Sequence, residues 1–155
     1  MTQAWRNLCT ALAAIGLAAL AACDDAGGDR ALDEERTACV DRINTFRATI
    51  DLPPLERWID AESCADDQAR ADSESGVAHD AFGQCEEHAQ NECPGWPSID
   101  DVIEGCLQMM WDEGPGEPYS EHGHYINMTN TAYTEVTCGF HTTPEGAVWA
   151  VQDFR

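Results

Sequence analysis

The apolar residues of the first third of the chain recur at helical spacing. Between residues 31 and 50 they are Leu32, Cys39, Val40, Ile43, Phe46 and Ile50. This repeat of three and four residues predicts one face of an amphipathic helix, and the prolines at positions 53 and 54 end it because proline cannot continue a helix. Residues 60–75 are rich in alanine and charge and are followed by Gly76, so they predict a second helix.

The middle of the chain combines an irregular stretch with a third helix. Residues 77–97 contain glycines, prolines and two cysteines, so we expect a loop tied by a disulfide between Cys85 and Cys93. Ser98 is a preferred helix N-cap residue, and the acidic residues after it suit the positive end of the helix dipole. A third helix is therefore predicted from Ser98 to Trp111.

Three short runs near the C-terminus have the composition of β-strands. They are residues 125–128, 133–140 and 147–154. Residues 142–146 contain a proline and a glycine, so the last two runs are expected to form an antiparallel hairpin. Because helices precede strands, the fold class is α+β, with about three main helices packed on a small, largely antiparallel sheet.

The first 22 residues have the features of a secretion signal. Arg6 precedes an apolar run from Leu8 to Leu20, and no acidic residue occurs before Cys23. This run is shorter than the roughly 20 apolar residues of a membrane-spanning helix. We therefore expect a signal peptide over residues 1–22 and an extracytoplasmic location for the rest of the chain, in the cell envelope.

The small residues before Cys23 resemble the lipobox of bacterial lipoproteins. In such lipoproteins, cleavage falls before the cysteine, and the cysteine thiol carries diacylglycerol. The resemblance implies a lipid on Cys23, a polar tether over residues 23–30, and attachment to a membrane or to the cell surface through that lipid. Ordinary signal cleavage after Ala22, with Cys23 unlipidated, is the alternative.

Of the eight cysteines, Cys9 leaves with the signal and Cys23 is the anchor candidate, which leaves six. They are Cys39, Cys64, Cys85, Cys93, Cys106 and Cys138. An even number of cysteines in a small secreted domain predicts three disulfides, although six cysteines can pair in about fifteen ways. A zinc–cysteine cluster is disfavoured because no two of them have the Cys-x2-Cys or Cys-x4-Cys spacing.

The charge of the chain limits its partners. The formal net charge is -21, and there is no lysine. Such an acidic surface repels phosphate backbones, so we expect no nucleic-acid partner. Repulsion between like charges favours a soluble monomer, while a cation or a basic partner remains compatible with this charge.

Several short motifs follow one another along the chain. They are Asn44-x-x-Arg47, Leu52-x-Pro54-Leu55-x-x-Trp58, Gly83-Gln84-Cys85-Glu86-Glu87-His88, Trp111-Asp112-Glu113, Gly123-His124-Tyr125 and Cys138-Gly139. In these motifs and their order, the chain resembles the CAP superfamily over about residues 36–154. That superfamily comprises cysteine-rich secretory proteins, antigen 5 and plant pathogenesis-related proteins, and its domain is also called SCP. The resemblance implies a CAP domain over residues 31–155, folded as an α-β-α sandwich with a cleft.

In that family two histidines and two glutamates line the cleft, and in several members they bind a divalent cation. The resemblance gives these roles to His79, Glu87, Glu113 and His124, with Glu86 and Glu92 as alternatives to Glu87. Zinc is the first ion to consider, since imidazole and carboxylate both ligate it. Without a metal, the same groups can form a hydrogen-bonded network that only holds the loops.

Three functions are compatible with these features. The first is a membrane-anchored binding module for a lipid, a peptide or a divalent cation. The second is a metal-dependent, protease-like hydrolase that uses the same four residues. The third is a structural or adhesive envelope protein. No Gly-x-Ser-x-Gly nucleophile motif occurs, and most family members lack an established activity, so we expect binding rather than catalysis.

Overall fold

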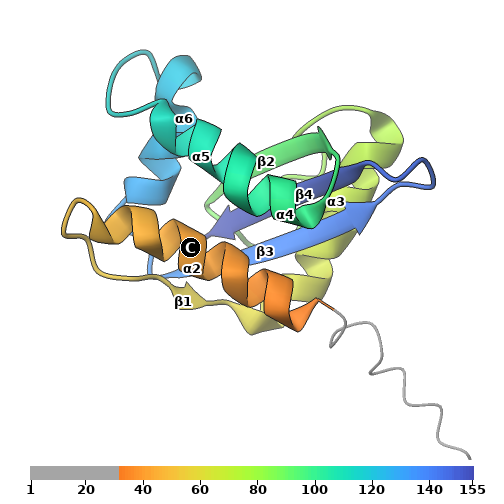
Figure 1. Ribbon diagram of the computed structural model, residues 1–155, viewed down its shortest axis with the longest axis horizontal. Coiled ribbons are helices and arrows are strands. Elements are labelled where there is room, and N and C mark those ends of the chain that lie inside the picture. The colour runs from red at the N-terminus through yellow and green to blue at the C-terminus, as the bar shows by residue number, and fades with distance from the viewer. Residues whose placement is uncertain (1–31) are drawn as a thin grey trace, which may run out of the picture.

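The structure is a computed structural model that describes residues 32–155 (Figure 1). The predicted signal peptide, Cys23 and the tether lie outside the described residues. Within residues 32–155, no helix is both long enough and apolar enough to cross a membrane.

The first two predicted helices are present. Helix α2 spans Asp33–Ala48 and helix α3 spans Glu62–Ser75, with a 3-10 turn, Ile59–Ala61, before α3. Helix α3 ends at Gly76, whose φ of 68° is a left-handed conformation that glycine adopts without strain. The Gly76 N–H donates to the carbonyl of Asp72 at 2.8 Å, which closes the last turn as the sequence predicts.

The third predicted helix is also present, in three consecutive parts. Helix α4 spans Ile99–Asp101, the π-helical turn η2 spans Val102–Cys106, and helix α5 spans Leu107–Asp112. The hydroxyl of Ser98 accepts the N–H of Asp101 at 3.0 Å, so Ser98 is the N-cap.

A fourth helix, α6 at Tyr119–Thr129, replaces the strand predicted over residues 125–128. That prediction is wrong because so short an apolar run fits either a strand or a helix. Met128 is buried, and the ring of Tyr125 packs on Trp111 with the ring centroids 4.7 Å apart. Tyr125 and Met128 are three residues apart, the spacing of one helical face, so inward packing selects the helix.

The sheet has four strands. They are β1 (Glu56–Arg57), β2 (Ala89–Trp96), β3 (Glu135–Thr142) and β4 (Val148–Phe154). Their order is β1-β3-β4-β2, with β1 parallel to β3 and the other pairs antiparallel. The predicted hairpin of the last two strands is confirmed, and β2 lies at one edge of the sheet.

Strand β2 corrects the prediction of an irregular loop over residues 77–97. Its first half is buried and pairs with β4, so that Asn91 lies opposite Gln152. Pro94 and Gly95, which disfavour a regular strand, lie in its exposed second half, where the register shifts between Cys93 and Trp96. Pairing with β4 outweighs the local preference, and the irregularity is confined to a bulge at the strand end.

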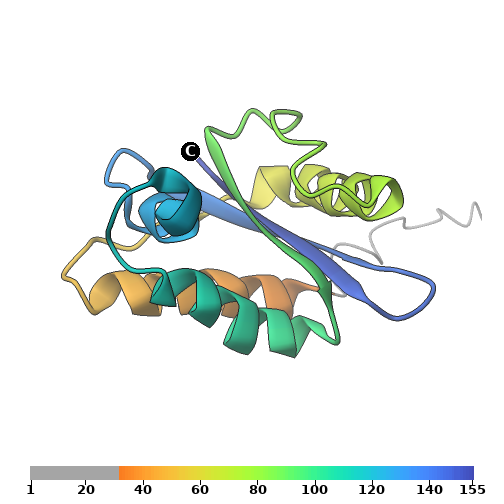
Figure 2. The same cartoon turned by 90° about the horizontal axis from the view of Figure 1, so that it is seen from above.

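The helices cover both faces of the sheet, as Figures 1 and 2 show: α3 on one face, α2 and α5 on the other. A Cβ added to Gly139 of β3 would lie 2.2 Å from the carbonyl carbon of Ala65, because the backbone of α3 lies directly on the strand. Figure 2 places α6 at one end of the sheet. The α+β class and the α-β-α sandwich are therefore confirmed.

Three disulfides staple these layers, as predicted. They are Cys39–Cys138, Cys64–Cys85 and Cys93–Cys106. The expected Cys85–Cys93 disulfide is wrong. Cys85 lies in the loop before β2 and bonds to α3, whereas Cys93 lies within β2 and bonds to η2, so neighbours in sequence are joined to different layers.

Candidate functional site

Glu113 and His124 form a carboxylate–imidazole pair between two helices. Glu113 directly follows α5, and His124 lies in the middle of α6. Oε1 of Glu113 is 2.5 Å from Nδ1 of His124, and Oε2 accepts the backbone N–H of His124 at 3.0 Å. A carboxylate acceptor at Nδ1 favours the tautomer with the proton there, which leaves Nε2 as a free ligand atom.

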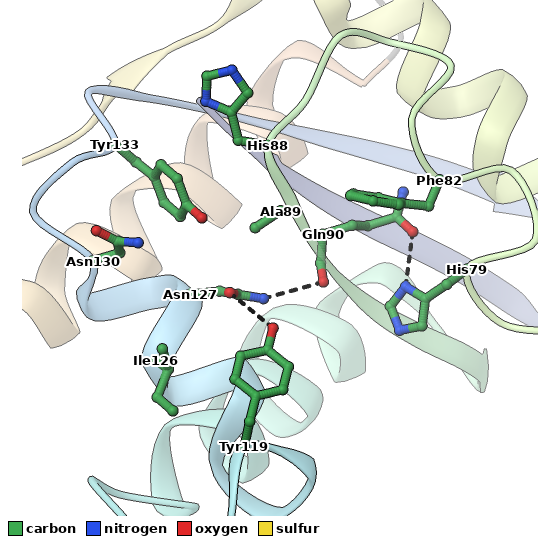
Figure 3. A pocket seen from close by; sticks show the side chains of 10 residues that line it. All are labelled: His79, Phe82, His88, Ala89, Gln90, Tyr119, Ile126, Asn127, Asn130 and Tyr133. Carbon is green, nitrogen blue, oxygen red and sulfur yellow. Dashed lines mark hydrogen bonds between the residues drawn. The ribbon is translucent and has the colours of Figure 1, made fainter.

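His79 is held in a similar way by strand β2. The His79 backbone N–H donates to Oε2 of Glu92 at 2.5 Å, and its ring Nδ1 lies 2.8 Å from Oε1 of Gln90 (Figure 3). The Gln90 amide nitrogen donates to Gln68 and to Asp153, so the amide oxygen faces His79. An amide oxygen only accepts, and Nε2 of His79 is therefore also left free.

Glu87, the glutamate first assigned to the cleft, has a different position. Its buried carboxylate accepts the backbone N–H of Gly83 and of Cys85 and the side-chain amide of Gln68. Glu86 is exposed. Glu92, the other alternative, is the glutamate in contact with His79, with its Oε2 3.6 Å from the ring Nδ1. The structure thus pairs His79 with Glu92, while Glu87 closes the loop before β2.

The two pairs do not form a closed cage of four ligands. Among residues 32–155, the only His, Cys, Asp or Glu side chains whose ligand atoms approach within 4.8 Å in a group of three are Cys85, Glu87 and Asp153. The Cys85 sulfur is in a disulfide, so that group does not fit a metal. His79 and His124 instead line one shared pocket of about 160 Å³. Two imidazoles thus face one cavity, which is the feature that a shared ligand would need.

A buried acidic cluster lies next to His79. Burial is the main cause that raises the pKa of Glu92 to about 8 and that of Asp153 to about 7, and the nearby Asp72 adds to both. Burial therefore favours the protonated form of Glu92. Asp72 also accepts the N–H of Ala81 at 2.7 Å, which ties the His79 loop to α3. No local motif identifies these residues, because they come from α3, β2 and β4.

A larger pocket, of about 390 Å³, opens beside His79 (Figure 3). Tyr119 and Tyr133 contribute their rings to its wall. The Tyr119 hydroxyl donates to Oδ1 of Asn127 at 3.2 Å, and Nδ2 of Asn127 donates to the carbonyl of Gln90 at 3.3 Å. Since these polar groups are bonded to one another, the pocket mainly offers a ligand ring faces and the His79 imidazole.

Comparison with known families decides the classification. The family model described as CAP, the cysteine-rich secretory protein family, matches residues 40–154. The chain belongs to the CAP family. The match includes both histidine–glutamate pairs of this CAP domain, and it confirms the family resemblance of the sequence motifs. A search of curated proteins found no match.

Solved structures with the same fold have little sequence identity to this CAP domain. Na-ASP-1 superposes with a TM-score of 0.62 at 14% identity over 79% of this chain. BmVAL-1 gives a TM-score of 0.60 at 15% identity, and an outer surface protein from Borrelia burgdorferi gives 0.59 at 16%, each also over 79% of this chain. The matched part covers 38% of Na-ASP-1, 76% of BmVAL-1 and 92% of the Borrelia burgdorferi protein. At such identities the likeness establishes the fold alone.

Proposed function

We propose that this chain is an extracytoplasmic binding module whose cleft holds a divalent cation between His79 and His124. The observation that carries this proposal is the shared pocket lined by both imidazoles, each with its Nδ1 bonded to an acceptor. Zinc-binding histidines typically donate the second ring N–H to a carboxylate or carbonyl in this way. Glu113 and Gln90 are thus the positioning residues for the two ligands, and Glu92 holds the His79 backbone.

Two imidazoles leave coordination positions for a ligand oxygen or water, so such a site is suited to binding rather than only to structure. His79 and His124 would hold the zinc ion, which would supply Lewis-acid character to the cleft. The acidic chain favours the approach of any cation, because its net charge is -21.

Calorimetric titration of the folded domain with zinc tests this proposal. We expect one site per chain in the wild type and loss of that site in the His79→Ala, His124→Ala double variant. His141→Ala is the matched control, because His141 lies in β3 and lines neither pocket described above. Equal zinc binding by the double variant and the wild type would contradict the proposal.

The location outside the cytoplasm has independent support. CAP domain proteins are typically secreted or extracellular, and three disulfides persist best in an oxidising compartment. The Borrelia burgdorferi protein that shares the fold is described as an outer surface protein. We further propose that residues 1–22 are a lipoprotein signal and that Cys23 carries the lipid that attaches the domain to a membrane.

A further inference from the structure

An apolar groove runs along α5 and ends at the Glu113–His124 pair. Its volume is about 370 Å³. Its apolar wall consists of Pro94, Trp96, Cys106, Met109 and Met110, and its polar end of Glu92, Glu113 and His124. The groove therefore joins an apolar surface directly to one half of the proposed cation site.

The apolar wall has both a rigid and an adaptable side. A Cβ at Gly105 would lie 2.7 Å from the Trp96 ring, so the indole lies directly against the backbone of η2. Met109 has 64% of its surface exposed, although it is a large apolar residue. Methionine side chains are flexible and polarizable and adapt to apolar groups of different shapes. A packed indole beside an exposed methionine suits a bulky apolar side chain.

The charge around the groove is of one sign. The elements that form it, β2, η2, α5 and α6, all lie between residues 71 and 154, where the sequence contains acidic residues and no lysine or arginine. Arg42 of α2 reaches the outer side of these helices, but it is engaged with Glu104 at 3.6 Å and with Gln108 at 3.0 Å. Cationic ligands are attracted to such a surface, and anionic ones are repelled.

We propose that this groove binds a cationic peptide segment in which a bulky apolar side chain stands next to an arginine or lysine. The apolar side chain enters between Trp96 and Met109, and in the metal-free protein the cationic group points toward the Glu113 end. In the metal-free protein, a fatty acid fits the apolar wall but brings its carboxylate to the acidic end, where no arginine or lysine of these elements can receive it. This inference rests on the proposed function in that the groove is part of the same cleft.

Fluorescence anisotropy with defined peptides tests the assignment. The probe is a labelled Gly-Leu-Arg-Phe-Arg-Gly peptide, compared with Gly-Leu-Glu-Phe-Glu-Gly and Gly-Ser-Arg-Ser-Arg-Gly and with dodecanoate as competitor. We expect binding of the first peptide only, weakened when the ionic strength is raised to ~0.15 M. Met109→Ser should weaken it by about tenfold, since a buried apolar contact is lost.

Ile59→Ser is the matched control, because Ile59 is 63% exposed and lies before α3, outside the groove. Circular dichroism of both variants checks that they fold. Equal affinity of the wild type and Met109→Ser, preference for the acidic peptide, or displacement of the peptide by dodecanoate at equal concentration would each overturn the inference.

Zinc titration separates this result from the proposed function. Met109→Ser should bind zinc like the wild type, because Met109 does not line the pocket shared by the two imidazoles. Zinc binding without peptide binding overturns only the groove assignment. Peptide binding that depends on Met109 in a protein that binds no zinc overturns only the cation site.

Discussion

The carboxylate of Glu113 bonds to His124 twice, at the ring Nδ1 and at the backbone N–H. One side chain therefore sets both the orientation of the imidazole and the position of α6 relative to the end of α5. His79 is held by two residues instead of one: Gln90 contacts its ring, and Glu92 accepts its backbone N–H. The two histidines of the proposed site are thus positioned by separate elements.

Glu113→Gln tests this positioning role. A glutamine can accept at only one of the two places, so we expect the zinc affinity to fall by about tenfold or more, as is typical when a residue that orients a metal-bound histidine is replaced. Titration calorimetry measures the affinity. Glu117→Gln is the control for the lost negative charge, since Glu117 is exposed in the loop before α6. Equal zinc affinities for Glu113→Gln and Glu117→Gln would show that Glu113 acts through its negative charge alone and does not position His124.

The stability of the metal-free domain should decrease as the pH rises from about 4 to about 8. Glu92 has a pKa raised to about 8 and Asp153 a pKa raised to about 7 in the folded state, mainly by burial. Between the pKa of these groups in the unfolded chain and their higher pKa in the folded protein, the folded protein keeps protons that the unfolded chain has released. The free energy of unfolding is therefore highest below the unfolded-state pKa and falls as the pH rises through this window. The loss is at most about 1.4 kcal/mol per pH unit for each group.

Urea unfolding in EDTA at several pH values measures this dependence. Glu92→Gln replaces the carboxyl group with a neutral one of similar shape, so its free energy of unfolding should depend less on pH between 5 and 8. Glu86→Gln removes an exposed carboxylate in the same segment and should retain the wild-type slope. Parallel curves for the wild type and Glu92→Gln would mean that Glu92 does not cause the dependence.

Two disulfides should differ in what their removal does. The Cys64–Cys85 disulfide closes a separation of 21 residues and ties the loop of His79 to α3. The Cys39–Cys138 disulfide spans 99 residues and joins α2 to β3. Replacing both cysteines of the longer link by alanine should cost about 1 kcal/mol more unfolding free energy than replacing those of the shorter one. Denaturant unfolding of the two double variants gives this comparison.

The same two double variants should rank differently in zinc affinity: the variant that loses less stability should lose more zinc binding. The Cys64→Ala, Cys85→Ala variant loosens the segment that carries His79, so its zinc binding should weaken. The Cys39→Ala, Cys138→Ala variant, measured where it is fully folded, should keep it. A weaker site in the second variant only would contradict the role of the His79 loop.

Cys23→Ser tests the lipid anchor. Two acyl chains of a diacylglycerol hold a protein stably on a membrane, since each buried methylene contributes about 0.8 kcal/mol. We expect the wild type in the membrane fraction and Cys23→Ser in the soluble fraction or in the medium. Ala22→Val, which alters a neighbouring residue of the signal, reports the effect on processing alone. Membrane retention of Cys23→Ser would contradict lipidation at this cysteine.

The sequence by itself determined the elements whose signals are local. The apolar repeat of α2, the cap at Ser98, the left-handed stop at Gly76 and the hairpin of β3 and β4 depend on residues within one or two turns of each other. The family motifs likewise pointed to Glu113 and His124, which lie 11 residues apart in the sequence and contact each other in the structure.

Only the tertiary structure decided what depends on partners distant in sequence. Residues 125–128 are helical because Tyr125 packs on Trp111, and Glu92 rather than Glu87 meets His79 because Glu92 lies in β2, which pairs with β4, whereas Glu87 bonds to the loop before β2. The cysteine pairing follows in the same way from the packing of layers, with Cys85 against α3 and Cys93 against η2. Sequence spacing cannot encode these contacts, because they form between elements that meet only when the sandwich closes.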